Sequence, residues 1–159
     1  MILFVCTGNT CRSPMAAVLA QKLLSEAGEP CAVQSAGVNA APLCAASTHA
    51  VSAMRDAGCD LLAHRSQRAT PQLITEAKLV LTMTSAHRVA VLSMVPNAGG
   101  KVFSLYGYAH GTDPAQTQFN NDVSDPFGGD FITYQQCAKQ IEQLLISSMG
   151  KIIQHIREA

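Results

Sequence analysis

The sequence predicts a three-layer α/β/α domain built around a four-stranded parallel sheet. Three observations favour this fold. Short apolar runs alternate with segments of helical periodicity, as in chains whose strands are connected by helices. Neither an internal repeat nor a low-complexity linker divides the chain, and its 159 residues match the size of one domain. Since 48% of the residues are hydrophobic, the chain can bury a large core, and we expect a single domain over residues 1–159.

The first half of the chain begins with a strand and a helix. Residues 2–5 are all apolar, as in a strand that is buried on both faces. A loop at 6–13 follows, and Pro14 stands where the first turn of a helix tolerates a proline. The helix is expected to end at Gly28, and the second strand is expected at 32–37.

The remaining segments continue the alternation. We expect helices at 46–57, from 70 onward, at 85–95 and at 131–156, with strands at 79–83 and 101–105. Residues 106–130 are polar and rich in Gly, Pro, Asn and Asp, which predicts a long loop. A loop of that length in a compact domain is more often functional than idle.

Composition argues against several functions. Lysine plus arginine equals aspartate plus glutamate, 11 of each, so the chain lacks the basic surface of a nucleic-acid-binding protein. No apolar run approaches the roughly 20 residues of a membrane span, and the start lacks the basic segment of a secretory leader. We therefore expect a cytoplasmic protein with mostly reduced thiols that binds neither nucleic acid nor membrane. The sequence does not establish the oligomeric state, for which a monomer is the default expectation.

Residues 6–13 have the clearest chemistry: a cysteine, five residues, an arginine and a serine. Ligands of parallel sheets bind beyond the carboxyl ends of the strands, and this loop directly follows the first strand. A loop that opens a helix directs several backbone N–H groups and the positive end of the helix dipole at one point, which suits a phosphate group. The predicted phosphate-binding loop comprises Thr7, Gly8, Asn9, Thr10, Cys11 and Ser13, together with Cys6 and Arg12.

Several loop residues have a recognisable task. Gly8 permits backbone conformations that a side chain would forbid. Arg12 offers a planar fork that matches two phosphoryl oxygens. The positive field of the loop favours the thiolate of Cys6, which is the nucleophilic form, and Ser13 can donate to that thiolate when it leaves. A buried cysteine at a strand end is often only a small hydrophobic residue. The combination of strand, glycine, Arg-Ser pair and proline favours catalysis instead.

A cysteine nucleophile that attacks phosphorus needs a proton donor for the leaving group, and the long loop offers three aspartates. We favour Asp125, because Pro126 and Phe127 follow it and form a rigid elbow with an apolar side chain to wall a pocket. Asp113 has the surroundings of an exposed turn residue. Asp122 could act as a cap or bond within its own loop.

With the motifs at 6–14 and 125–129, the sequence resembles the low-molecular-weight protein tyrosine phosphatase family nearly from end to end. The resemblance implies that Cys6 forms a phosphocysteine while Asp125 protonates the leaving group, and that Asp125 then activates the water that releases phosphate. It implies a phosphorylated protein as substrate and inorganic phosphate as product. No metal or other cofactor is expected, because the loop amides and Arg12 already neutralise the phosphate.

The resemblance also implies a supporting network and a redox pair. The network consists of a strained Asn9 hydrogen-bonded with Ser13, Ser35 and His64. Cys11 is expected to pair with Cys6 on oxidation, which would protect the nucleophile. Packing beneath the loop is an equally good explanation of Cys11.

Two pocket residues point to a subgroup, the bacterial protein arginine phosphatases. Most tyrosine-specific members carry a bulky aliphatic residue where this chain has Thr10, and an aromatic pair or Asp-Pro-Tyr near the acid. A small polar Thr10 leaves room for a guanidinium, and Phe127 could stack on its plane. We therefore expect phosphoarginine as the substrate, with phosphotyrosine as the alternative.

Two further functions share this scaffold. A thioredoxin-coupled arsenate reductase has a very similar loop but needs two more cysteines after the third strand, and residues 78–95 contain none. A non-catalytic phosphate-binding module would be expected to lack Cys6 or Asp125, and both are present.

Overall fold

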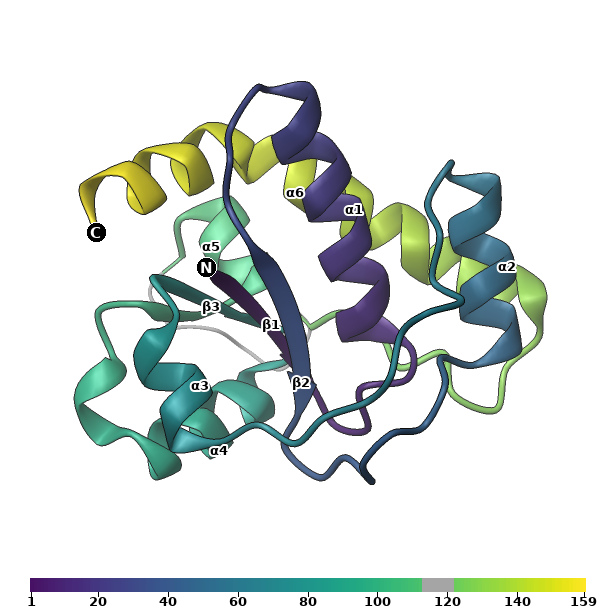
Figure 1. Ribbon diagram of the computed structural model, residues 1–159, viewed down its shortest axis with the longest axis horizontal. Helices are drawn as coiled ribbons and strands as arrows, with labels where there is room; N and C mark the ends of the chain where they lie inside the picture. Colours follow the sequence, from purple (N-terminus) through teal and green to yellow (C-terminus); the bar gives the residue numbers. More distant parts are fainter. Residues whose placement is uncertain (113–121) are drawn as a thin grey trace.

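Four parallel strands form a sheet in the order β2-β1-β3-β4, with helices on both faces (Figure 1). This computed structural model describes residues 1–112 and 122–159. The strands are β1 Ile2–Cys6, β2 Val33–Gly37, β3 Leu79–Thr82 and β4 Val102–Ser104. The helices are α1 Arg12–Glu26, α2 Thr48–Asp56, α3 Pro71–Glu76, α4 Ser85–Met94, α5 Leu105–His110 and α6 Phe131–Glu158, with a short 3₁₀ turn at Pro96–Ala98. The predicted three-layer fold is confirmed.

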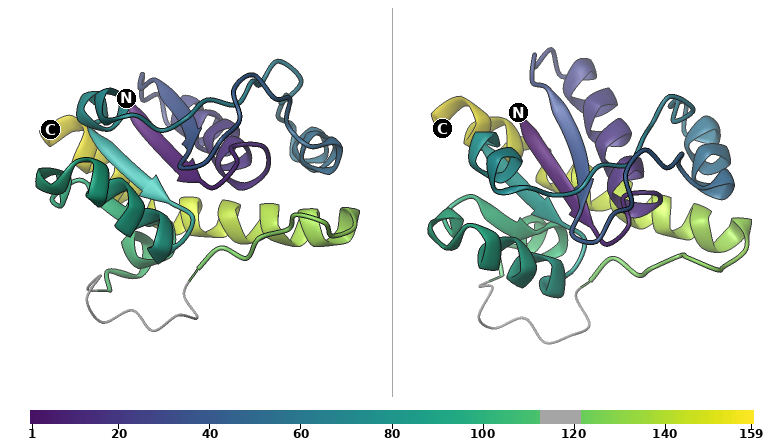
Figure 2. Two further views of the ribbon diagram at one scale, coloured as in Figure 1. Left: turned by 90° about the horizontal axis from the view of Figure 1, so that it is seen from below. Right: turned by 60° about the horizontal axis from the view of Figure 1, so that its bottom comes forward.

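Alternate residues of β1 face opposite layers, because successive side chains of a strand point to opposite faces of the sheet. Ile2 and Phe4 pack in the core beneath α1, α2 and α6. Leu3 and Val5 pack in the core beneath α3 and α4. These residues are all fully buried, which explains why the strand is an unbroken apolar run. The left view in Figure 2 shows the sheet between the two helical layers.

The topology places the end of β1 at the centre of the carboxyl edge. β1 pairs with β2 on one side and with β3 on the other, so Cys6 lies beside Gly37. A Cβ on Gly37 would collide with the carbonyl oxygen of Thr7. Glycine at this position therefore lets the chain after β1 approach its neighbour closely.

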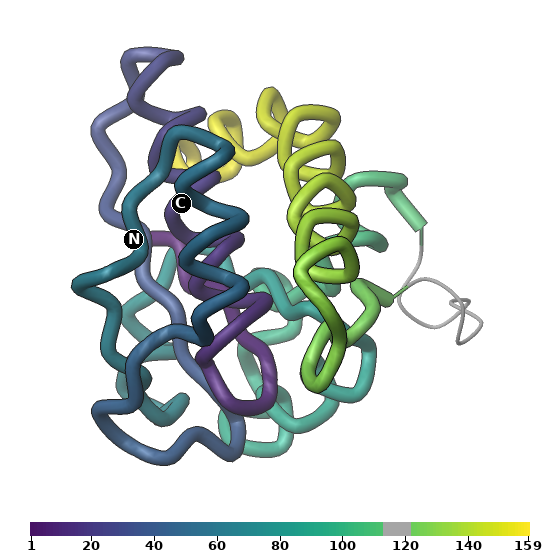
Figure 3. The backbone as a smooth tube through the Cα atoms, turned by 90° about the vertical axis from the view of Figure 1, so that its right-hand side faces the viewer, coloured from purple at the N-terminus to yellow at the C-terminus, as the bar shows by residue number. Residues whose placement is uncertain are grey.

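Most predicted helices begin where a side chain caps them. Ser47, Thr70, Thr84 and Asp130 each accept a hydrogen bond from a backbone N–H in the first turn of the following helix. The cap at Ser47 explains why α2 begins at Thr48 rather than at residue 46. α6 continues to Glu158, two residues beyond its predicted end, and crosses the layer that it shares with α1 (Figure 3).

One prediction about the second half of the chain was wrong. Residues 106–110 were expected to lie in a loop, but they belong to α5. Ser104 caps this helix by accepting from the Gly107 N–H, and Gly111 ends it with φ 65°. These signals lay in the sequence, but the high content of polar residues and glycine outweighed them. Over residues 1–112 and 122–159, no helix is both long enough and apolar enough to cross a bilayer.

Candidate active site

The loop between β1 and α1 surrounds a cavity of about 240 Å³ at the carboxyl edge of the sheet. The cavity is lined by Cys6, Thr7, Gly8, Asn9, Thr10, Cys11 and Arg12, and on the other side by Asp125 and Phe127. The right view in Figure 2 shows the chain before α6 passing near this loop, although the two segments are far apart in sequence. The fold thus brings together the predicted nucleophile, the predicted acid and both predicted pocket residues.

Cys6 is held by two hydrogen bonds at the end of β1. Its Sγ lies 2.9 Å from Ser13 Oγ and 3.3 Å from the backbone nitrogen of Asn9. The residue is only 3% exposed. The Asn9 N–H donates to the sulfur, and the Ser13 hydroxyl is within hydrogen-bond distance of it.

Asn9 fixes the shape of the loop. Its φ of 57° lies in the left-handed region, which asparagine tolerates better than most residues, and its side chain is fully buried. Asn9 Nδ2 donates to Ser13 Oγ and to Ser35 Oγ, both at 2.9 Å. Asn9 Oδ1 accepts from the Gln67 backbone N–H at 2.9 Å. All three hydrogen bonds constrain the loop from behind.

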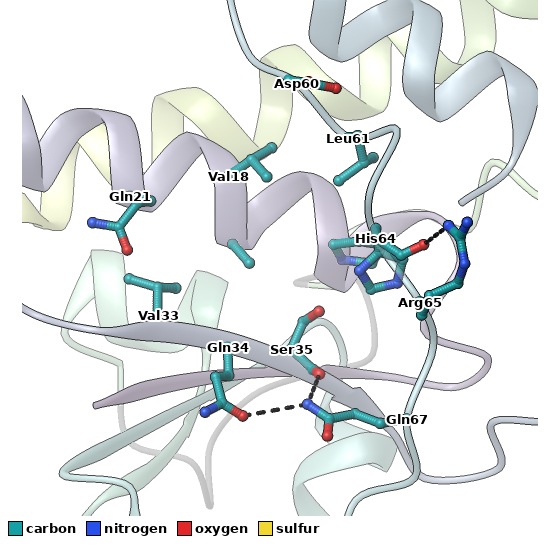
Figure 4. Close-up of a pocket in the computed structure, with 12 residues that line it drawn as sticks. Val18, Gln21, Val33, Gln34, Ser35, Asp60, Leu61, His64, Arg65 and Gln67 are labelled. Atoms are coloured by element: carbon teal, nitrogen blue, oxygen red, sulfur yellow. Dashed lines mark hydrogen bonds between the residues drawn. The ribbon is translucent and has the colours of Figure 1, made fainter. Parts of the chain in front are cut away.

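The His64 side chain contacts this network at the backbone of Asn9 rather than at a side chain of the network. His64 Nε2 lies 2.7 Å from the carbonyl oxygen of Asn9. Figure 4 shows His64, Ser35 and Gln67 around a second cavity of about 350 Å³ behind the loop. Sequence reasoning missed Gln67, and no motif marks it, because its backbone N–H bonds Asn9 while its side chain bonds the carbonyl oxygen of Ser35.

Arg12 is buried and reaches across to the segment before α6. Its Nη1 donates to the carbonyl oxygen of Val123 at 3.2 Å, and its Nη2 lies 3.2 Å from Asp125 Oδ2. The Asp125 side chain is 53% exposed, whereas that of Arg12 is 6% exposed. Asp125 Oδ1 accepts from the Phe127 N–H at 3.2 Å, which turns the chain at Pro126. The carboxylate therefore stands at the cavity with one face open to solvent.

Of the two other aspartates that the sequence offered, Asp122 does not line this cavity. Asp122 Oδ1 accepts from the backbone N–H of Ser85 at 2.8 Å, so it ties the chain to the start of α4. Asp113 lies outside the described residues.

Thr10 and Phe127 form the outer wall. Phe127 is 79% exposed, and its ring is free to contact a bound group. The Thr10 hydroxyl lies 3.7 Å from Cys11 Sγ, and the Thr10 carbonyl oxygen accepts from the Ser47 N–H at 2.9 Å. The small side chain of Thr10 leaves that part of the cavity open.

Cys11 lies on the α6 side of the loop. Its thiol donates to Ser47 Oγ at 3.5 Å, and its sulfur is 3.3 Å from the hydroxyl of Tyr134. Burial, together with the hydrogen bond to Cys11, raises the pKa of Tyr134. Cys6 and Cys11 are both free thiols in this structure.

His87 is a site residue that sequence reasoning did not find. It lies in the first turn of α4, and its Nε2 is 2.8 Å from Thr7 Oγ1. Burial and the nearby Arg12 guanidinium lower the pKa of His87 to about 4. The sequence did hold one signal. His87 comes three residues after Thr84, the cap of the helix that follows β3. That position lies at the edge of the sheet where the loop lies.

Metal ligands do not gather here. Among the residues that the structure describes, no three His, Cys, Asp or Glu side chains are grouped so that they could hold a metal ion. The cavity lies at the N-terminal end of α1, and Arg12 lines it. Such an arrangement is suited to an anion with several oxygens.

Comparisons with known proteins agree with this geometry. The family model described as low molecular weight phosphotyrosine protein phosphatase matches residues 1–158. Curated proteins named protein-arginine-phosphatase from Geobacillus stearothermophilus and Bacillus subtilis are each 41% identical over 144 residues. These matches cover 91% of this chain in both cases, and 90% and 91% of the two relatives, respectively.

A solved structure is similar over nearly the whole chain. It is a cysteine-to-serine mutant of the YwlE arginine phosphatase with a phosphorylated active-site serine. The TM-score is 0.86 at 38% sequence identity, and the match covers 95% of this chain and 94% of the other. The family model, the relatives and the cysteine-centred cavity agree, and the chain belongs to the low molecular weight phosphotyrosine protein phosphatase family.

Proposed function

We propose that this chain hydrolyses phosphoarginine in cytoplasmic proteins through a phosphocysteine formed on Cys6. The observation that carries the choice of phosphoarginine is the wall of the cavity, where the small hydroxyl side chain of Thr10 and the exposed ring of Phe127 accompany Cys6 and Asp125. The likeness to relatives named protein-arginine-phosphatase supports the same substrate.

In the first step, Cys6 Sγ attacks phosphorus and the bond from phosphorus to the guanidino nitrogen breaks. The electron pair of that bond goes to the nitrogen, which takes a proton from Asp125. Phosphoryl oxygens accept hydrogen bonds from the loop N–H groups and from Arg12, which has five N–H donors in a fixed plane. The ion pair between Arg12 and Asp125, at 3.2 Å, indicates that the acid can reach a group held by the arginine.

In the second step, water attacks phosphorus, Asp125 takes a proton from that water, and the bond between sulfur and phosphorus breaks. Cys6 leaves as a thiolate. The Ser13 hydroxyl can turn its proton from the carbonyl oxygen of Ala36, 3.3 Å away, to this thiolate, because Asn9 Nδ2 already donates to Ser13 Oγ. Cys6 Sγ lies 2.9 Å from that oxygen.

Thr10 is proposed as the residue that selects the substrate. A branched aliphatic side chain here would pack well against a phenyl ring but would crowd the wider, polar phosphoguanidinium. The guanidinium carries only N–H donors, and the hydroxyl oxygen of Thr10 can accept from them. Phe127 can cover the guanidinium plane by a cation–π contact.

Phosphotyrosine is the alternative substrate, because it is the substrate in the description of the family. The test measures kcat/KM for a phosphoarginine peptide and a matched phosphotyrosine peptide under reducing conditions. We expect a clear preference for phosphoarginine. A preference for phosphotyrosine would overturn the substrate assignment while leaving the proposed roles of Cys6, Arg12 and Asp125 untouched.

A substitution at the wall sharpens this test. Thr10→Ile is expected to shift the ratio of the two kcat/KM values toward phosphotyrosine by about tenfold, as one change of pocket shape can do. Thr10→Ser keeps the hydroxyl and the small size, so it serves as the matched control and should keep the ratio of the parent. An unchanged ratio in Thr10→Ile would contradict the proposed selection.

A further inference from the structure

One partly buried contact joins the phosphate-binding loop to the neighbouring helix without a part in the mechanism above. Thr7 Oγ1 and His87 Nε2 are 2.8 Å apart. Thr7 follows the nucleophile in sequence and lines the same cavity. His87 lies in the first turn of α4, and the parallel pairing of β1 with β3 places that turn beside the loop.

The other ring nitrogen of His87 indicates the direction of this hydrogen bond. His87 is 6% exposed, and its Nδ1 has no hydrogen-bond partner among the described residues. Buried N–H groups without an acceptor are rarer in proteins than buried acceptors without a donor, so the ring proton belongs on Nε2. The lowered pKa of His87, about 4, agrees with a neutral ring that carries one proton. Nε2 therefore donates to Thr7 Oγ1.

This direction determines what Thr7 can do in the cavity. A threonine hydroxyl has one proton and two lone pairs. Because His87 uses a lone pair of the oxygen, Thr7 keeps its own proton for a different acceptor. A bound phosphoguanidinium offers acceptors only on its phosphoryl group, since its nitrogens carry N–H donors.

We propose that His87 is a positioning residue that commits the Thr7 hydroxyl to donate to a phosphoryl oxygen of the substrate and of the phosphate product. Thr7 then adds a side-chain donor to the backbone donors of the loop. The inference rests on the proposed function only in requiring that the loop binds a phosphoryl group, and it does not depend on which side chain carries that group.

The test removes each partner separately and together in the reduced full-length chain. Thr7→Val removes the hydroxyl at constant size, and His87→Met removes the donor to it. Binding of inorganic phosphate is measured by calorimetry, and kcat/KM is measured on p-nitrophenyl phosphate. Loss of a hydrogen bond to a charged group predicts about a tenfold weaker phosphate Kd and a similar loss of kcat/KM in Thr7→Val.

The double variant shows whether His87 acts through Thr7. We expect the double variant to be no worse than Thr7→Val alone, because the same donor is already lost. His87→Gln should restore most of the phosphate affinity that His87→Met loses, since its amide N–H can donate from a similar position. Thr75→Val and His110→Met are matched controls that should leave both readouts unchanged, because both side chains are exposed and bond within their own helices.

Two outcomes would overturn the proposal. One is an unchanged phosphate Kd in Thr7→Val, and the other is losses that multiply in the double variant. Thr7→Val keeps His87 in place, so the first outcome is readable even if His87→Met does not fold. Failure of the substrate assignment has a different signature, namely a phosphotyrosine preference together with an intact effect of Thr7→Val on phosphate binding.

Discussion

The phosphate-binding loop and the segment that carries Asp125 border the same cavity but are held in opposite ways. Cys6 is 3% exposed, and Asn9 and Ser13 are fully buried. The Asp125 side chain is 53% exposed, and Phe127 is 79% exposed. The side chains of Asn9 and Ser13 bond to each other and to β2, whereas Asp125 contacts one guanidinium and one backbone N–H.

The difference follows from what each region has to do. Donors that stabilise a developing charge work best when they are already oriented, because no reorganisation is then needed at the moment of reaction. A group that gives and takes protons must instead exchange them with water and with the substrate. A rigid cradle, formed by the phosphate-binding loop at 6–13, lies beside a more open acid segment around Asp125, and the pair provides both. Each prediction below tests one side of this contrast.

The largest effect is expected for the atom at the base of the cradle. Cys6→Ser should abolish turnover of p-nitrophenyl phosphate, because serine at this position is a far weaker nucleophile than a thiolate. Phosphate binding, measured by calorimetry, should persist, since the loop amides and Arg12 are unchanged. Cys44→Ser alters an exposed thiol and serves as the control. Retained turnover in Cys6→Ser would remove Cys6 from the role of nucleophile.

The open segment should affect catalysis without affecting the cradle. We expect Asp125→Ala to lower kcat by about 10²–10⁴-fold, the range for a lost general acid. Its melting temperature should change little, because the side chain is half exposed and makes few contacts. The comparison variants are Asp113→Ala and Asp122→Ala. Should either of them slow kcat as much as Asp125→Ala does, the acid has been misassigned.

Asn9 tests the rigidity of the cradle. Asn9→Ala should reduce the free energy of unfolding by about 2–4 kcal/mol, because Ser13, Ser35 and the Gln67 N–H lose buried partners. Asn9→Gly loses the same hydrogen bonds but relieves the left-handed backbone, so it should be about 1 kcal/mol more stable than Asn9→Ala. Urea unfolding of the two variants measures both the stability lost with the hydrogen bonds and the stability regained by relief of the left-handed backbone. Equal stabilities would mean that the φ of 57° stores no strain.

The difference between local order along the chain and contacts between distant segments explains which features the sequence could predict. The alternation of apolar runs and capped helices predicted the sheet, and the Cys-to-Ser spacing located the cradle, because both depend on local order along the chain. Gln67 and His87 could not be found in this way. Gln67 reaches Asn9 through a backbone N–H, and His87 meets Thr7 only because β1 and β3 are adjacent in the sheet.

The α5 error has a different cause. Ser104 and Gly111 bracket a short helix, but six residues of mixed polarity carry no strong period. Packing against α6 stabilises this helix, through contacts such as the one between the Tyr108 hydroxyl and the carbonyl oxygen of Lys151. Such a contact has no signature in the local sequence.

The last predicted effect concerns pH and the buried His87. Its pKa is about 4 in the folded protein against 6.5 for an ordinary histidine, mainly because of burial and then because of Arg12, although Asp122 and Asp125 act in the opposite direction. Between these two values the unfolded chain binds the proton more tightly, so stability falls as the pH drops from about 6.5 to 4. Above that window the histidine is neutral in both states, so it adds nothing to the pH dependence of the free energy of unfolding.

His87→Gln should therefore reduce the pH dependence of the free energy of unfolding within this window, as measured by urea unfolding. The reduction corresponds to less than one proton. His110→Gln, at an exposed histidine, is the matched control and should keep the parent slope. A parental slope in His87→Gln would mean that His87 is protonated as readily in the fold as in the unfolded chain, and would weaken the case for a neutral ring that donates to Thr7.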